Sequence, residues 1–194
     1  MLHAGIRDAY EAGIERLEKA SGVALEARSA TAVDPARTQA AAVVFTTDGK
    51  SFARNPLLAQ EVFGPSTLIV RCESASELKA IAAGLEGHLT ATIHATEADL
   101  VEHASLISIL ETKVGRILIG GFPTGVEVCH SMHHGGPYPA TTSSLFTSVG
   151  MTALRRFARP VCYQNFPQAS LPPALQDDNP LGIWRVVDGE RVKG

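Results

Sequence analysis

Glu61 and Phe63 lie two residues apart, directly before a Gly64-Pro65 pair. An ionised glutamate presents two acceptor oxygens in one plane, which suits the adjacent hydroxyls of a ribose. A phenylalanine ring offers a flat apolar face to a base, and Gly-Pro ends the segment and tolerates close approach of a ligand. The stretch is a candidate clamp for a nucleotide. The alternative is the end of a helix, with Phe63 in the core and Glu61 in solvent.

A second candidate for chemistry is the stretch C-H-S-M-H-H at residues 129–134. Its thiol and imidazole groups are good zinc ligands, but structural zinc sites draw four ligands from two separated pairs. The sequence offers no second pair, so we assign no metal ligand and keep a zinc-binding loop as a weaker hypothesis. The residues by themselves also fit a surface loop rich in glycine and histidine.

The three cysteines, Cys72, Cys129 and Cys162, are candidates for a nucleophile. Cys72 and Cys162 lie in predicted strands, where a cysteine is usually a small core residue. Cys129 adjoins His130, and a neighbouring imidazolium lowers the pKa of a thiol, but neighbours in sequence need not touch. We therefore assign no catalytic residue. An odd number of widely spaced cysteines indicates no disulfide framework and favours a reducing cytoplasm.

Alternating strands and helices must position these groups. The runs 67–72, 89–95 and 116–120 predict strands, and the segments 74–85 and 96–112 predict helices between them. This order predicts an α/β fold, a mostly parallel sheet flanked by helices. The uninterrupted apolar run 67–72 further predicts a strand covered on both faces.

The flanking regions have weaker patterns. Apolar spacing predicts a helix over 1–20 and another over 146–158, with a β-branched strand at 41–47 and a further strand at 159–165. The stretch 22–40 is left unassigned. Asp48-Gly49 predicts a turn, and Asp188-Gly189 predicts a hairpin. The length of 194 residues predicts one domain, 1–194, with a Pro-rich tail from about residue 166.

The bulk composition excludes several classes of protein. The chain is 45% hydrophobic and 19% charged, with a net charge of -3, so nothing indicates a nucleic-acid partner or an acidic lipid surface. No apolar run reaches the roughly 18 residues that span a bilayer. The N-terminus lacks the basic and apolar regions of a signal peptide. We expect no nucleic-acid and no membrane partner.

The order of several motifs resembles a known family. Residues 57–121, from L-L-A-Q-E-V-F-G-P-S-T-L-I-V to G-R-I-L-I-G-G, are similar to the C-terminal part of NAD(P)-dependent aldehyde dehydrogenases. The runs G-G-P-Y-P-A-T-T (135–142), F-T-S-V-G (146–150) and R-P-V-C-Y-Q-N-F-P (159–167) resemble the branch with α-ketoglutarate semialdehyde (2,5-dioxovalerate) dehydrogenases.

The resemblance implies a chemistry and a set of site residues. In the family, a cysteine thiolate attacks the aldehyde, hydride passes to NAD or NADP, and a glutamate-activated water releases the acid. The resemblance implies that Glu61 binds the nicotinamide ribose and that Phe63 lies near the nicotinamide. It also implies that Phe122, His133 and His134 line the aldehyde pocket, although residues 122–134 depart from the commoner family pattern.

The chain also lacks motifs of the family. No cysteine precedes Glu61, and no G-x-G-x-x-G occurs. We therefore predict a C-terminal fragment that is inactive alone and that needs an N-terminal half or forms a homo-oligomer. The alternative is a non-catalytic subunit or interaction module that retains the fold. A sheet without its other half would expose apolar surface, which favours a partner in either case.

Overall fold

A computed structural model describes residues 1–193, and the chain divides into two compact units, Met1–Arg156 and Phe157–Gly194. The single domain predicted over 1–194 stays a prediction.

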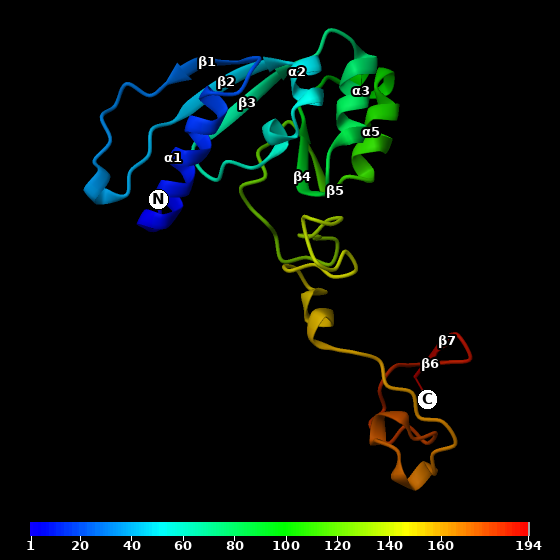
Figure 1. The fold of residues 1–194 in the computed structure, drawn as a ribbon. Coiled ribbons are helices and arrows are strands. Elements are labelled where there is room, and N and C mark those ends of the chain that lie inside the picture. The colour runs from blue at the N-terminus through cyan, green and yellow to red at the C-terminus, as the bar shows by residue number, and fades with distance from the viewer. Residues whose placement is uncertain (194) are drawn as a thin grey trace. The chain divides into compact units, whose positions relative to one another are not determined.

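The regular elements lie mostly in the first unit (Figure 1). The helices are α1 (Ala4–Glu18), α2 (Gly49–Arg54), α3 (Ala75–Gly84), α4 (Glu97–Glu102) and α5 (Ala104–Glu111). The strands are β1 (Val23–Arg28), β2 (Val43–Asp48), β3 (Ser66–Arg71), β4 (His88–Ile93), β5 (Val114–Ile119), β6 (Arg185–Val187) and β7 (Glu190–Val192). Within residues 1–193, no helix combines the length and apolar character needed to cross a bilayer.

The first sheet has the order β1-β2-β3. Strand β1 is antiparallel to β2, and it comes from a segment that the sequence left unassigned. Strands β2 and β3 are parallel, in a register that runs from Val43 opposite Ser66 to Asp48 opposite Arg71. The sheet thus holds the start of β3 beside the start of β2, which places the end of the Glu61–Pro65 segment next to Val43.

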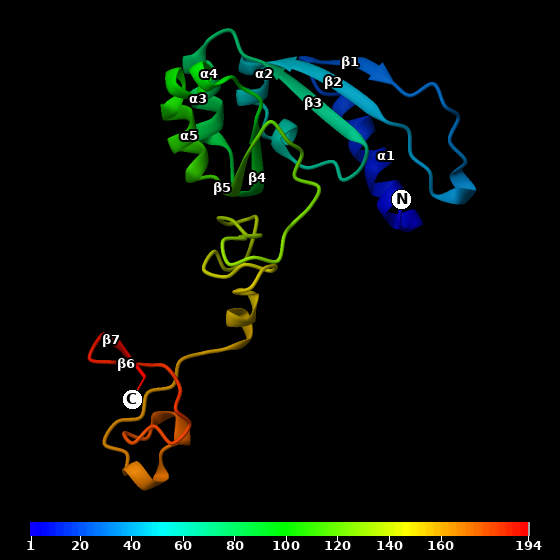
Figure 2. The same cartoon turned by 180° about the vertical axis from the view of Figure 1, so that it is seen from behind.

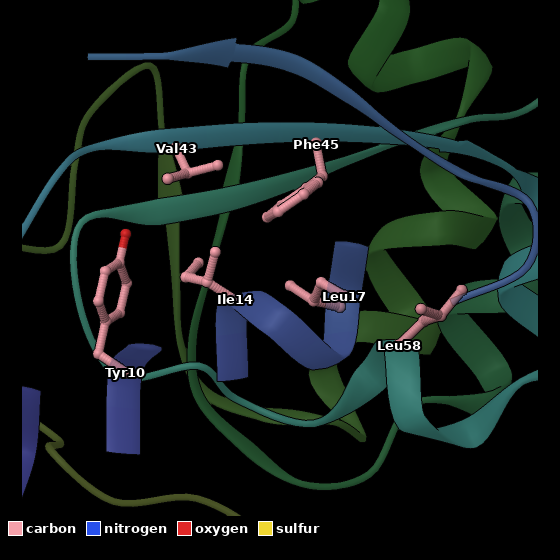
Figure 3. Close-up of a cluster of buried hydrophobic side chains, with 6 residues drawn as sticks. All are labelled: Tyr10, Ile14, Leu17, Val43, Phe45 and Leu58. Atoms are coloured by element: carbon pink, nitrogen blue, oxygen red, sulfur yellow. The ribbon is translucent and has the colours of Figure 1, made fainter. Parts of the chain in front are cut away.

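Helix α1 packs on one face of this sheet and forms the main core (Figure 3). Its apolar residues recur every three or four positions, so they line one side of the helix. The buried residues of the cluster are Tyr10, Ile14 and Leu17 from α1, Val43 and Phe45 from β2, and Leu58. The predicted helix over 1–20 is confirmed, although Leu2 is exposed.

Strands β4 and β5 form a separate parallel pair. Helix α5 contacts both β5 and α3, and Figures 1 and 2 show α3 and α5 side by side next to these strands. Parallel strands with helices confirm the predicted α/β class. The single parallel sheet expected from 67–120 is divided, because β3 pairs with β2 and not with β4.

The helix starts follow local capping chemistry. The Ser74 hydroxyl accepts a hydrogen bond from the backbone N–H of Glu77 at 3.2 Å. The Glu77 carboxylate accepts from Glu73 N–H at 2.7 Å, one residue before the Ser74 N–H that a capping box would use. Asp48 caps α2 by accepting from Ser51 N–H, so the expected turn at 48–49 is a helix start.

Three expectations about elements are wrong. The single helix over 96–112 is interrupted at His103, which ends α4 and precedes α5. The helix expected over 146–158 is reduced to a 3-10 turn at Ala153–Phe157. The strand expected at 159–165 is absent from these residues. The hairpin at Asp188-Gly189 is confirmed by the pairing of β6 with β7.

Strand β3 is not covered on both faces as its apolar run predicts. Its residues alternate between half-buried and exposed, and Ile69 is 43% exposed. The covered face is the one that faces α1, where Leu68 packs against the core cluster. Alternation of this kind is typical of a strand with one solvated face.

The Tyr10 hydroxyl gives the first testable prediction. It donates hydrogen bonds to Ala41 O at 2.7 Å and to Pro65 O at 3.3 Å, and its side chain is buried. Tyr10→Phe keeps the ring but leaves these carbonyls without the donor, so we expect the free energy of unfolding to fall by about 1–2 kcal/mol.

Urea denaturation of the purified chain measures this change. Tyr138→Phe is the matched control, because Tyr138 is 81% exposed, and its free energy of unfolding should change by less than about 0.5 kcal/mol. Equal losses in the two variants would contradict the role assigned to Tyr10.

Candidate functional site

The candidate clamp lies in an irregular segment between the 3-10 helix Pro56–Ala59 and β3. Glu61 is exposed, and Phe63 is 67% exposed. The alternative of a helix end with Phe63 in the core does not describe this segment, since it is not helical and the ring faces solvent. Both side chains are therefore available to a ligand.

Close packing against α1 holds this segment in place. Gly13 of α1 contacts Val62, and a Cβ atom on Gly13 would lie 2.7 Å from Val62 Cγ1. Gly64 contacts the Tyr10 ring, and a Cβ there would lie 2.3 Å from Tyr10 Cδ2. The Tyr10 hydroxyl reaches Pro65 O. Because Val62 and Gly64 contact α1, residues 61 and 63 remain accessible.

Two hollows border the exposed side chains. One, of about 290 Å³, lies on the α1 side and includes His3 and Arg16 in its lining. The other, of about 540 Å³, lies on the β3 side and includes Leu58 and Thr67. Glu61 and Phe63 line both hollows. The larger hollow is within the usual size of small-molecule sites, about 300–1,000 Å³, and it places a carboxylate and an aromatic ring together.

Phe122 lies elsewhere, just after the carboxyl end of β5. Its ring is 5.8 Å from that of His94, which follows β4, with the ring planes tilted by 53°. Phe122 is 79% exposed. Since the carboxyl ends of parallel strands share one edge of a sheet, this aromatic pair marks that edge of the β4–β5 pair.

His133 and His134 lie toward the opposite ends of the same strands. A Cβ atom on Gly115, at the start of β5, would lie 2.2 Å from Gly135 O. One on Gly87, just before β4, would lie 2.2 Å from Pro137 O. The loop after the histidines therefore crosses the amino ends of β4 and β5. The structure does not bring Phe122 together with His133 and His134.

The histidine loop is well anchored to a later segment. His134 N–H donates to Thr147 Oγ1 at 2.8 Å, and Ser148 N–H donates to His134 O at 3.0 Å. Cys129 O accepts from Met151 N–H at 3.1 Å. Both His133 and His134 are half-buried, so this loop is ordered by hydrogen bonds on both of its sides.

The cysteines are free thiols in different surroundings. Burial raises the pKa of Cys72, and the charge of Glu77 raises it further. Cys129 Sγ lies 3.4 Å from Ser131 Oγ, so its hydrogen-bond partner is a hydroxyl and not an imidazole. Cys162 is exposed. Within residues 1–193, no group of three or more Cys, His, Asp or Glu side chains could hold a metal ion.

Two residues that organise these regions were missed by the sequence reasoning. Tyr10 supports the clamp, and only its place in an apolar stripe was visible. Arg116 lies in the middle of β5 and donates to Gly125 O at 2.9 Å. A charged residue inside an apolar strand is the signal that could have singled it out.

The chain is similar to known enzymes in sequence and in fold. It is 46% identical over 192 residues to alpha-ketoglutaric semialdehyde dehydrogenase 2 of Azospirillum brasilense, which covers 98% of this chain and 36% of that protein. The chain thus spans about a third of the length of this curated relative, which fits the expected fragment. No family model matches the chain.

Solved structures share its fold at low identity. Succinic semialdehyde dehydrogenase from Streptococcus pyogenes, in complex with NADP+, matches at a TM-score of 0.53 and 21% identity, over 69% of this chain and 27% of that chain. Betaine aldehyde dehydrogenase from Staphylococcus aureus, in complex with NAD+, matches at a TM-score of 0.55 and 17% identity, over 81% and 29%.

The contact between Gly64 and Tyr10 gives a second prediction. In Gly64→Ala the new Cβ would meet Tyr10 Cδ2 at 2.3 Å and Met1 Cε at 2.6 Å, so we expect the free energy of unfolding to fall by about 1–3 kcal/mol. Chemical denaturation measures it. Gly84→Ala is the control, because its Cβ meets nothing within 4 Å. That variant should be unchanged or stabilised by up to about 1 kcal/mol. Equal stability of Gly64→Ala and the unmodified chain would contradict the contact.

The cysteines give a third prediction. Because the pKa of Cys72 is raised, a smaller fraction of this thiol is thiolate at pH 8. Iodoacetamide should therefore label Cys72 more slowly than the exposed Cys162, as followed by peptide mass spectrometry. The difference should disappear in urea. Equal rates in the folded chain would show that Cys72 is not shielded.

Proposed function

Since the chain is homologous to an aldehyde dehydrogenase over nearly its whole length and has the fold of part of one, we propose that it acts within an NAD(P)+-dependent enzyme that oxidises a semialdehyde to the acid. The observation that carries the proposal is the 46% identity over 192 residues with an alpha-ketoglutaric semialdehyde dehydrogenase. The exposed Glu61-x-Phe63-Gly64-Pro65 segment is the part of the cofactor site that the chain would supply.

The residues of the clamp fit a nicotinamide nucleotide. Bound NAD+ or NADP+ supplies the hydride acceptor. The Glu61 carboxylate is exposed beside the hollows of about 290 and 540 Å³. It would accept hydrogen bonds from two ribose hydroxyls, and these bonds are strong because the acceptor is charged. The exposed Phe63 ring covers one face of the heteroaromatic ring and excludes water from it. Packing of Val62 and Gly64 against α1 keeps these two groups in position.

The remaining chemistry needs groups outside this pair. In the proposed reaction a cysteine thiolate adds to the aldehyde carbon, and loss of hydride from this adduct gives the thioester. The three cysteines of this chain are not placed to serve. Cys72 has a raised pKa, and the nearest partner of Cys129 Sγ is Ser131. We propose that the isolated chain does not catalyse the reaction and that a nucleophile and a base come from further protein sequence.

Phe122, His133 and His134 are the proposed substrate-pocket residues. The Phe122 ring marks the carboxyl edge of β4 and β5, while the histidines lie toward the amino edge. A protonated histidine would suit the carboxylate of an acidic semialdehyde. Because the two groups lie at opposite ends of the strands, they would contact different parts of the pocket or different states of the loop between them.

Exposed apolar side chains support the need for a partner. Leu145 is 84% exposed, Phe157 is 90% exposed and Trp184 is 67% exposed. Removing large apolar side chains from water is favourable, so a missing N-terminal half or a second copy of the chain is the proposed cover. The three free cysteines support a cytoplasmic location.

A chimera tests the proposed function and gives the fourth prediction. Residues 1–194 replace the matching segment of the Azospirillum brasilense relative, and NAD(P)H formation from α-ketoglutaric semialdehyde is followed by absorbance. We expect the chimera to be active and this chain alone to be inactive. In the chimera, Glu61→Gln should raise the KM for the cofactor by about tenfold, because hydrogen bonds to a charged acceptor contribute about 1.5–3 kcal/mol.

The matched control is Glu86→Gln, which removes another exposed carboxylate and should leave the KM unchanged. A folded but inactive chimera would overturn the proposed activity. It would favour the alternative, a non-catalytic subunit or interaction module. Activity of this chain by itself would overturn the need for further sequence.

A further inference from the structure

Arg116 is a half-buried cation without an anionic partner. It lies in the middle of β5, and within residues 1–193 no carboxylate forms an ion pair with it. A guanidinium carries five N–H donors. Here Nη1 donates to Gly125 O at 2.9 Å and lies 3.7 Å from Met132 Sδ, whereas Nε and Nη2 are buried and have no acceptor.

The two unpartnered nitrogens form one edge of the guanidinium. Nε and Nη2 point their N–H bonds in the same direction, which is the geometry that accepts both oxygens of a carboxylate. Buried polar groups almost always have partners, and burying an unpaired charge costs several kcal/mol. An anion on this edge would satisfy both requirements at once.

A nearby imidazole has the same unsatisfied character. His134 Nδ1 is also buried without a partner. His134 lies in the chain between Met132, which contacts Arg116, and Gly135, whose carbonyl approaches Gly115. Four buried side-chain atoms in residues 1–193 lack a partner, and three of them belong to Arg116 and His134. The unsatisfied groups are therefore concentrated where the histidine loop crosses β5.

The segment 122–128, which contacts Arg116 Nη1 through Gly125 O, is weakly attached. Residues 122–128 are exposed, and within the described chain their one hydrogen bond to a distant element is the Arg116–Gly125 bond. Their other backbone bonds are local, such as Thr124 N–H to Phe122 O at 2.8 Å. Segments with exposed backbone and few anchors open at low free-energy cost. Such opening would break the Gly125 contact and let a small molecule approach the guanidinium.

We propose that the Nε–Nη2 edge of Arg116 binds the carboxylate of a small 2-oxo acid, with residues 122–128 as its cover. This site rests on the proposed function, because it would take the acid end of the semialdehyde and of its product. It adds a specificity residue that lies between Phe122 and the histidines. The carboxylate binds without forming or breaking a covalent bond.

The test uses this chain labelled with 15N-arginine. The Arg116 Nε–H signal is assigned by its loss in Arg116→Lys, and 2-oxoglutarate is the probe. We expect a saturable shift of the Arg116 signal and no shift of Arg185 Nε–H, the internal control, whose Nη groups donate to Gln176 O and Asp177 O. Dimethyl 2-oxoglutarate, which lacks the carboxylates, should shift neither signal.

Variants give the second measurement. Arg116→Lys keeps the charge but loses the two-donor edge, so calorimetry should show at least a tenfold weaker affinity for 2-oxoglutarate. Arg185→Lys should bind like the unmodified chain. An Arg116 signal that 2-oxoglutarate leaves in place, or equal binding by Arg116→Lys, would overturn the site. If the Arg116 signal shifts with protein concentration when no acid is added, the bound carboxylate belongs to a second copy of the chain. That result would also overturn the proposed acid site.

These outcomes are independent of the test of the proposed function. Acid binding is read on this chain, whereas dehydrogenase activity is read on the chimera. Binding at Arg116 beside an inactive chimera would retain the site and reject the activity. An active chimera whose affinity for the acid is unaffected by Arg116→Lys would retain the activity and reject the site.

Discussion

The Tyr10 hydroxyl is the interaction on which the candidate cofactor site depends. It joins α1 to Ala41 O, just before β2, and to Pro65 O, just before β3. A buried phenol needs an acceptor, and this one finds two in the short gap between parallel strands, where Val43 N–H also donates to Pro65 O at 3.0 Å. One side chain therefore ties the helix to the segments just before β2 and β3 and to the turn after Phe63. The exposure of Glu61 and Phe63 follows from this arrangement, because the alternate residues of their segment face the helix.

Close backbone contacts play the same role in the second region. Gly115 approaches Gly135 O, and Gly87 approaches Pro137 O, at positions where a Cβ would meet backbone atoms at 2.2 Å. These contacts bring the loop after the histidines across the amino ends of β4 and β5, while Phe122 stays at the carboxyl ends. Arg116 lies between these two edges and contacts both limbs of the loop, at Gly125 and at Met132. The geometry of any pocket here is thus set by one strand and by the loop that returns along it.

The sequence predicted elements well where local chemistry decides them. The α1 stripe, the helix predicted from residue 74 and the Asp188-Gly189 hairpin all depend on neighbours within a few residues. It failed where distant partners decide. The apolar run of β3 reads as buried on both faces, yet this chain covers only one of them. The aromatic and apolar residues over 146–165 gave helix and strand patterns, but few tertiary contacts support either there. The order of the motifs located Glu61 and Phe63. The roles of Tyr10 and Arg116 depend on contacts with Pro65, 55 residues away in sequence, and with Gly125, nine residues away.

The coupling of α1 to the Glu61–Pro65 turn has a consequence for the dynamics of the chain. Because Tyr10 and Gly13 pack directly on this turn, α1 cannot detach without releasing the clamp. A nucleotide held by Glu61 and Phe63 would therefore resist the detachment of a helix that it never touches. By mass action, ligand at a hundred times its dissociation constant would add about 2.7 kcal/mol to the opening free energy. The amide protons of α1 would then exchange with solvent about a hundredfold more slowly, which makes the first helix a remote reporter of an occupied clamp.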